Sequence, residues 1–218
     1  MIQGVYLVTD RNLCGARGVT QVVTQAARAG AGCIQLREKT ASTRRFIETA
    51  ARIRAGLSPY RIPLIINDRV DVALATGADG VHVGQSDMPP ETARRLLGPR
   101  AIIGLSVESW EDVVVAQKLD VNYLGISPVY ATPTKTDTKK PWGLKGVSRV
   151  KRFSRHPLVA IGGLDAANAG DVIQAGADCI AVVSAICAAP NPFEATAQLK
   201  TIIEKALDPL NPWPLESY

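Results

Sequence analysis

The chain has 218 residues, of which 46% are hydrophobic and 21% are charged, a balance typical of a globular protein with a sizeable core. Its formal net charge is +5, but acidic residues are interleaved with the basic ones and aromatic residues make up only 5%, which argues against nucleic-acid binding. No apolar run approaches the length of a membrane span and no signal peptide is recognisable, so we expect a cytoplasmic protein that binds no membrane.

Short apolar runs alternate with longer segments of helical periodicity along the chain. Strands are expected at residues 4–9, 33–38, 63–67, 79–84, 101–106, 122–127, 157–163 and 179–184. Helices are expected between them, for example at residues 19–29, 43–55, 108–118 and 166–175, with a last helix at 192–207. Gly-Ala-Gly at 30–32 and Gly-Ala-Asp at 77–79 and 176–178 supply glycine where a helix ends before the next strand.

Eight such units in 218 residues predict a parallel sheet with crossover helices, and eight is the number of strands that closes a (β/α)8 TIM barrel. The alternative is an open doubly wound sheet. That fold usually has fewer strands, and its nucleotide-binding form carries G-x-G-x-x-G after the first strand, where this chain has TDRNLCGARG. We therefore expect one catalytic barrel domain over residues 1–207 and a tail, rich in proline and aromatic residues, over 208–218.

The four cysteines form no Cys-x-x-Cys pair, which gives no indication of a zinc site or a redox motif. Cys33 and Cys179 lie in apolar runs and are expected in the core. This usage of cysteine fits a reducing compartment.

Polar side chains after the second strand point to function, because barrel active sites lie at the C-terminal ends of the strands. Gln35, Arg37 and Lys39 fall on one face by alternation. Three long polar side chains inside a barrel are costly unless they bind something. An internal layer of salt bridges, with Glu38 outside, is the alternative.

Asp68 and Asp87 follow the third and fourth strands and are expected to lie side by side. Two adjacent carboxylates repel each other, and a divalent cation removes the repulsion; Mg²⁺ typically takes one or two protein carboxylates. The alternative is that each caps the helix that follows it. His82, on the fourth strand, fits a core histidine as well as a functional one.

Ser106 ends the fifth strand, and because no Ser-His-acid set is apparent in the sequence, we expect it to form hydrogen bonds rather than act as a nucleophile. The sixth strand runs into a donor-rich loop that includes Thr132, Thr134 and Lys135. Such a loop suits phosphate groups, and Lys135 would attract an anionic substrate.

Glycines and a serine follow the last two strands, where many barrels bind phosphate through backbone N–H groups. Gly163 allows close approach of a ligand, and Ser184 follows the eighth strand. The alternative for residues 162–163 is a tight turn before a helix capped by Asp165. A pair of carboxylates that binds a cation, together with a phosphate pocket, suggests a diphosphate substrate or two phosphorylated substrates.

Seven segments resemble, in order, the motifs of the thiamine-phosphate synthase family. They are QLREK (35–39), INDRVDVA (66–73), GVHVGQSDMP (80–89), GLSVES (104–109), GISPVYATPTKTDT (125–138), AIGGL (160–164) and VVSAI (182–186). The resemblance covers roughly residues 4–207, while TKKPWGLKG (138–146) departs mildly from it. It implies a TIM barrel that joins 4-amino-2-methyl-5-(diphosphooxymethyl)pyrimidine to 4-methyl-5-(2-phosphooxyethyl)thiazole and releases pyrophosphate.

The resemblance also implies roles for individual residues. It implies contacts to the pyrimidine diphosphate from Gln35, Leu36, Arg37, Glu38, Lys39, Asn67, Ser106 and Lys135. It implies Mg²⁺ ligation by Asp68 and Asp87, and a thiazole-phosphate pocket formed by Thr132, Pro133, Thr134, Gly163, Val183 and Ser184. Catalytic roles are implied for Arg37, Lys39, Ser106 and Lys135. The implied reaction is an alkyl transfer without a covalent enzyme intermediate, since the aminopyrimidine stabilises positive charge at its exocyclic methylene.

Three other functions stay open at this point. A paralogue of the family isomerises the thiazole phosphate but lacks much of the diphosphate and metal equipment, which Lys39, Asp68, Asp87 and Lys135 supply here. A regulatory phosphate-binding barrel needs a pocket but no metal pair, and a sugar-phosphate isomerase needs an acid–base pair that is not obvious in the sequence. A homo-oligomer is compatible with all of them.

Overall fold

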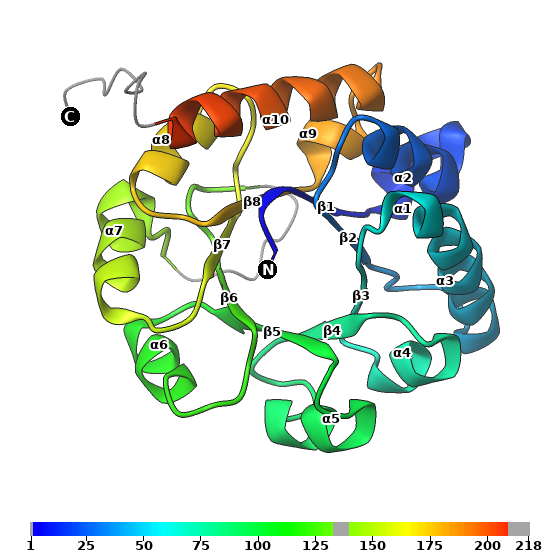
Figure 1. The fold of residues 1–218 in the computed structure, drawn as a ribbon, viewed down its shortest axis with the longest axis horizontal. Helices are drawn as coiled ribbons and strands as arrows, with labels where there is room; N and C mark the ends of the chain where they lie inside the picture. Colours follow the sequence, from blue (N-terminus) through cyan, green and yellow to red (C-terminus); the bar gives the residue numbers. More distant parts are fainter. Residues whose placement is uncertain (1, 133–139, 209–218) are drawn as a thin grey trace.

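The computed structural model describes residues 2–132 and 140–208, and its strands form a closed barrel in which every strand is parallel to its sequence neighbours (Figure 1). The strands are β1 (Gly4–Val8), β2 (Cys33–Leu36), β3 (Leu64–Asn67), β4 (Gly80–Val83), β5 (Ile102–Val107), β6 (Tyr123–Ile126), β7 (Leu158–Ile161) and β8 (Cys179–Val182). The prediction of a single (β/α)8 TIM barrel is confirmed. Most strands end one or two residues earlier than expected, so their polar C-terminal residues lie in loops.

Helices surround the barrel and cover its outer face (Figure 1). They are α1 (Arg11–Cys14), α2 (Gly18–Arg28), α3 (Thr43–Leu57), α4 (Val70–Thr76), α5 (Pro90–Leu97), α6 (Trp110–Ala116), α7 (Gly143–Phe153), α8 (Ala169–Gln174), α9 (Ser184–Cys187) and α10 (Pro192–Leu207), with 3₁₀ turns η1 (Gly15–Arg17) and η2 (Ser58–Tyr60). The expected helix-ending glycines Gly30, Gly77 and Gly176 all adopt positive φ, as that role requires. The short helices α1 and α9 were not predicted.

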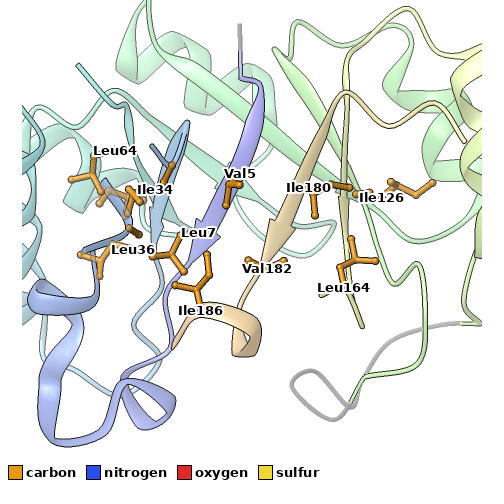
Figure 2. Close-up of a cluster of buried hydrophobic side chains, with 14 of the residues drawn as sticks. Val5, Leu7, Ile34, Leu36, Leu64, Ile126, Leu164, Ile180, Val182 and Ile186 are labelled. Atoms are coloured by element: carbon orange, nitrogen blue, oxygen red, sulfur yellow. The ribbon is translucent and has the colours of Figure 1, made fainter. Parts of the chain in front are cut away.

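The main core lies between the barrel and its helices. Its members around β1 and β8 are drawn in Figure 2: Val5, Leu7, Ile34, Leu36, Leu64, Ile126, Leu164, Ile180, Val182 and Ile186. A smaller cluster includes Tyr6, Val8, Ile65, Tyr123 and Val159, which face the barrel interior together with the expected core cysteines Cys33 and Cys179. Because both faces of a parallel sheet are covered, strand residues on either face are buried.

Side chains at the N-terminal ends of the strands hold neighbouring strands together in pairs. Asp79, just before β4, accepts a hydrogen bond from Leu64 N–H at 2.8 Å and donates its own N–H to the Leu64 carbonyl at 2.9 Å. Asn122 and Asp178 form the same two-bond contact with β5 and β7. The Gly-Ala-Asp motifs therefore carry a structural aspartate as well as a helix-ending glycine.

All four cysteines are buried and free. Over the described residues, no helix combines the length and the apolar character that crossing a membrane requires. The tail at 209–218 lies outside the described residues, so its assignment as a separate segment stays a prediction.

Candidate active site

A cavity of about 640 Å³ opens at the C-terminal ends of the strands, the face where active sites of this fold lie. Most of the residues that the sequence singled out line it. They are Gln35, Arg37, Lys39, Asn67, Asp68, Asp87, Ser106, Thr132, Gly163, Val183 and Ser184. The volume is within the range of small-molecule sites. Side chains spread over the whole chain thus meet around one space.

Of the remaining predicted residues, two have side chains that do not line this cavity and three lie outside the described residues. Leu36 is fully buried in the core outside the barrel (Figure 2), and the carboxylate of Glu38 is bound by both Nε and Nη2 of Arg11. Substrate contact by Leu36 and Glu38 stays a prediction, although neither side chain lines the cavity. Pro133, Thr134 and Lys135 lie outside the described residues, and their roles stay predictions.

The end of β2 directs its alternate residues into the cavity, as predicted. Gln35 is buried, Arg37 is half-buried and Lys39 is exposed, so charge increases from the floor of the cavity to its rim. Arg37 Nη1 lies 3.4 Å from Asp10 Oδ2, and Arg37 N–H donates to Thr9 Oγ1 at 3.0 Å. The alternative of internal salt bridges is realised in part, because Arg37 lines the cavity and also pairs with Asp10.

Asp87 lies close enough to Asp68 to act on its carboxyl group. Burial is the largest cause, and the Asp87 carboxylate the next, of a rise in the pKa of Asp68 to about 6. Hydrogen bonding to Asn67 and the charge of Lys39 act in the opposite direction. The pair therefore favours a shared positive partner at neutral pH.

The backbone at Asp68 adopts a conformation that is uncommon for a residue with a side chain. Its φ is 62°, and Arg69 N–H donates to the Asn67 carbonyl at 2.7 Å, which closes a three-residue turn around Asp68. Such strain tends to be kept where function requires it. The turn directs the carboxylate into the cavity.

Neither aspartate caps a helix. α4 follows Arg69 and α5 follows Pro89, in both cases without a side-chain cap. Asp87 Oδ2 instead accepts the Gly84 N–H at 2.7 Å, within the turn after β4. The capping alternative was therefore wrong for both residues.

The aspartate pair suits a cation that needs few protein ligands. Within residues 2–132 and 140–208, no three His, Cys, Asp or Glu side chains gather as a metal site. Mg²⁺ commonly takes one or two protein carboxylates and completes its shell with water and substrate phosphate. Asp68 and Asp87 fit that pattern.

On the opposite rim, the turn after β7 packs tightly against the loop after β6. Gly162 and Gly163 have φ of 102° and 66°. A Cβ at Gly163 would lie only 2.8 Å from the Ala131 carbonyl oxygen and from Tyr130 Cβ. Tyr130 N–H donates to the Gly162 carbonyl at 3.0 Å. The two glycines thus allow the loop that carries Thr132 to reach the cavity wall.

The helix after β7 begins differently from the sequence prediction. α8 follows Asn168, not Asp165. Asp165 accepts the Ala167 N–H at 2.8 Å, and Asn168 Nδ2 donates to the Gly163 carbonyl at 2.9 Å. These bonds fix a tight turn at the cavity rim, and phosphate binding at Gly163 stays a prediction.

A buried polar network forms part of the cavity floor. Tyr123 Oη lies 2.8 Å from Tyr6 Oη and 2.9 Å from His82 Nδ1. His82 Nε2 lies 2.8 Å from Ser106 Oγ, and Gln35 Nε2 donates to Tyr6 Oη at 3.0 Å. Ser106 therefore has a histidine partner that the sequence did not reveal, but a tyrosine stands where a catalytic triad places a carboxylate.

Sequence reasoning missed Tyr6 and Tyr123 as site residues. Both lie in fully apolar runs, where burial on both faces hides the alternation. A tyrosine in a strand predicted to be buried could have indicated a polar network, because a buried tyrosine hydroxyl usually requires a hydrogen-bond partner. The rim residues Gln85, Glu108 and Asp112 were also not singled out.

Comparisons with known proteins agree with one another. A family model described as thiamine monophosphate synthase matches residues 5–186. The thiamine-phosphate synthase of Albidiferax ferrireducens is 54% identical over 200 residues, covering 92% of this chain and 91% of that one. The thiamine-phosphate synthase of Leptospira biflexa is 56% identical over 203 residues, with 91% and 97% covered. A solved structure of thiamine phosphate pyrophosphorylase from Pyrococcus furiosus superposes with a TM-score of 0.87 at 38% identity, with 94% and 98% covered.

Proposed function

Because the chain belongs to the thiamine monophosphate synthase family, we propose that it makes thiamine phosphate. It is a transferase of thiamine biosynthesis that condenses 4-amino-2-methyl-5-(diphosphooxymethyl)pyrimidine with 4-methyl-5-(2-phosphooxyethyl)thiazole and releases pyrophosphate. The observation that carries this function is a single cavity with a carboxylate pair beside Lys39 on one side and glycine backbone on the other. Each side suits one of the two phosphorylated substrates.

The pyrimidine diphosphate belongs on the side of β2 to β4. Arg37 and Lys39 supply positive charge there, and the sequence adds Lys135 from the loop after β6. Asp68 and Asp87 would hold Mg²⁺, which when bound would offset the negative charge of the diphosphate. Mutual repulsion of the two carboxylates, shown in the raised pKa of Asp68, supports this assignment.

The thiazole phosphate belongs on the side of β6 to β8. Thr132 lines the cavity there beside the backbone at Gly163 and Ser184. Backbone N–H groups of loops after the seventh and eighth strands bind phosphate in many barrels. Binding at this point would direct the ring of the acceptor toward the centre of the cavity.

The reaction breaks the bond between the exocyclic methylene and the diphosphate oxygen, which keeps the electron pair. The thiazole nitrogen donates its lone pair to the methylene carbon and becomes the quaternary nitrogen of the product. Negative charge grows on the leaving group, and the cationic side chains stabilise it there. The protein's second contribution is orientation of the two rings, because both substrates are anchored by phosphate at opposite rims.

A pyrophosphate-release assay tests the function directly. We expect release only when both substrates and Mg²⁺ are present, with thiamine phosphate as the organic product. Release without the thiazole phosphate would indicate a hydrolase. Absence of release from folded protein that still binds the thiazole phosphate would refute the synthase function and favour isomerisation or binding alone.

A further inference from the structure

Five polar side chains form a continuous hydrogen-bonded row from one wall of the barrel interior to the other. In order they are Gln35 on β2, Tyr6 on β1, Tyr123 on β6, His82 on β4 and Ser106 on β5. All five line the cavity. We call this row the relay. We propose that its hydrogen bonds all point the same way, from Gln35 to Ser106, so that the Ser106 hydroxyl is a hydrogen-bond donor to the bound pyrimidine substrate. The proposal rests on the proposed function and adds positioning residues to it.

The direction of the relay follows from its first member. The Gln35 amide nitrogen can only donate, so the Tyr6 oxygen accepts at 3.0 Å. The Tyr6 proton then points to Tyr123, 2.8 Å away. Since the Tyr123 oxygen accepts that proton, its own proton points to His82 Nδ1 at 2.9 Å.

The next hydrogen bond, between His82 and Ser106, points the same way. With Nδ1 as an acceptor, a neutral ring carries its proton on Nε2, which donates to Ser106 Oγ at 2.8 Å. The Ser106 proton cannot point back at His82 and is directed to an acceptor atom of the substrate in the cavity. Tyr6, Tyr123 and His82 are thus positioning residues that act through Ser106.

The relay keeps one proton per tyrosine because neither phenol ionises easily. Burial is the main cause that raises the pKa of both Tyr6 and Tyr123 well above the usual value. The rings also hold each other in place: Tyr6 meets Tyr123 edge to face at 6.0 Å, and Tyr123 stacks on His82 at 5.5 Å. The hydroxyl positions are therefore set by packing as well as by hydrogen bonds.

Two strand glycines leave the space that the relay occupies. A Cβ at Gly104 would lie 2.3 Å from Tyr123 Oη and 2.5 Å from His82 Nδ1. A Cβ at Gly125 would lie 2.8 Å from His82 Cε1. Neither glycine has a positive φ, so close approach of the relay, not backbone conformation, explains the absence of a side chain at both positions.

The direction can be read from the tautomer of His82. The chain has only two histidines, so ¹⁵N NMR of histidine-labelled protein at pH 7.5 gives few signals, and Tyr123→Phe identifies those of His82. We expect the proton on Nε2 and a bare Nδ1. His156 supplies the second set of signals; its Nε2 lies 3.0 Å from the Ala116 carbonyl and 3.4 Å from Arg155 Nε, and its signals are recognised because Tyr123→Phe leaves them unchanged. A proton on Nδ1 of His82, in either a neutral or a charged ring, would overturn the direction.

The link to Ser106 is tested by a double-mutant cycle. Tyr123→Phe keeps the ring and is expected to lower kcat/KM about tenfold, the effect of one lost hydrogen bond of about 1.4 kcal/mol. In a Ser106→Ala background the same change is expected to alter kcat/KM less than about twofold, because the relay acts only through the serine. An equal tenfold loss in both backgrounds would overturn the proposal.

A matched control separates positioning from stability. Thr196 does not line the cavity, and its buried hydroxyl donates to the Pro192 carbonyl. Thr196→Val should therefore lower the melting temperature and leave kcat/KM unchanged. Tyr6→Phe, one step further from Ser106, should lower kcat/KM by less than Tyr123→Phe. The double-mutant cycle requires an active wild-type enzyme, and an inactive wild type would refute the proposed function itself. If the wild type is active and the losses from Tyr123→Phe and Ser106→Ala add up, only the relay is refuted.

Discussion

At the scale of single residues, Asp68 combines two features that lower stability. Its φ of 62° is unfavourable for a residue with a side chain, and the side chain is half-buried beside the carboxylate of Asp87. Neither feature is required to form the barrel, since the strands close through backbone pairing. Both are understandable if the residue exists to bind a cation.

Cation binding should depend on pH in a window set by Asp68. The pKa of this carboxyl in the metal-free protein is about 6, so protons compete with a divalent cation below that pH. We expect the dissociation constant for Mn²⁺, used as a probe for Mg²⁺, to be nearly constant from pH 7 to 8 and to rise about tenfold per pH unit below 6. Titration calorimetry at four pH values measures this, and an affinity that is flat down to pH 5 would contradict it.

Replacing Asp68 by asparagine should stabilise the metal-free protein. Because the pKa is raised on folding, this carboxyl favours the folded state below its unfolded value near 3.8, and that contribution is lost as the pH rises through about 6. At pH 7.5 with a chelator, Asp68→Asn is expected to raise the melting temperature by ~3 °C, or about 1 kcal/mol after allowing for solvent screening.

Asp71 is the control for that measurement. It pairs with Arg69 on the surface of α4, and hydrogen bonding to that guanidinium is the main cause that lowers its pKa. The ionised carboxylate of Asp71 therefore stabilises the folded state, whereas that of Asp68 destabilises it. Asp71→Asn should leave the melting temperature unchanged or lower it slightly. A fall in melting temperature for Asp68→Asn in the absence of metal would refute the repulsion between Asp68 and Asp87.

Among single residues, those whose place in the cavity was predicted correctly were the ones whose type alone is informative. Charged side chains directly after a strand, such as Lys39 and Asp87, mark a barrel mouth in sequence. Tyr6 and Tyr123 were not recognised because their role depends on which face of the strand they occupy. Only the barrel register brings the two hydroxyls to 2.8 Å of each other across 117 residues of chain.

At the scale of elements, the turn after β7 and the loop after β6 form one unit. Val129 N–H donates to the Ile161 carbonyl at 2.9 Å, which continues the pairing of β6 and β7 beyond the strands. The absent side chain at Gly163 is what allows the loop to follow this path. The position of Thr132 therefore depends on a glycine 31 positions later in the sequence.

Gly163→Ala should weaken binding of the thiazole phosphate while the barrel stays folded. The added methyl group would press on Ala131 and Tyr130 at 2.8 Å and displace the loop. We expect KM for the thiazole phosphate to rise roughly 10- to 100-fold, with little change in KM for the pyrimidine diphosphate, measured by pyrophosphate release.

Gly98→Ala is the matched control for backbone strain. Gly98 also has a positive φ, 86°, but a Cβ there meets no atom within 4 Å. It ends α5 at the opposite end of the barrel, so its replacement should lower stability and leave both KM values unchanged. Equal KM changes in the two variants would show that strain, not contact with the loop, is responsible.

Elements were predicted well where hydrophobic pattern and glycine signals agreed. All eight strands and the long helices α2, α3 and α10 were located within about three residues. The helices α1 and α9 have four residues each, too few for any periodicity to be visible. Capping was misassigned at Asp68, Asp87 and Asp165, because loops after strands hold these carboxylates in turns whose geometry a single sequence does not reveal.

At the scale of the whole molecule, the two ends of the barrel differ in what their carboxylates do. At the C-terminal ends of the strands, Asp68 and Asp87 face the cavity. At the N-terminal ends, Asp79 and Asp178 accept hydrogen bonds from the backbone of the preceding strand. Counting βα units was sufficient to predict closure. It did not show which aspartates serve the site and which hold strands, because all four stand next to strands in the sequence.

This division predicts opposite effects for the same substitution at the two ends. Asp178→Ala leaves the buried N–H of Leu158 without its acceptor and removes the partner of Lys151, which should cost about 1–3 kcal/mol and lower the melting temperature by roughly 3–10 °C. Its kcat/KM should stay within about twofold of the wild type. Asp87→Ala loses the hydrogen bond from Gly84 N–H but also removes the repulsion from Asp68, so its melting temperature should change little, while kcat should fall by about 100-fold or more. Thermal melts and pyrophosphate release on both variants measure the two effects.

If Asp178→Ala lost activity at a temperature where it is fully folded, the N-terminal end of the barrel would have to influence the site, and the separation of stability from chemistry would be wrong.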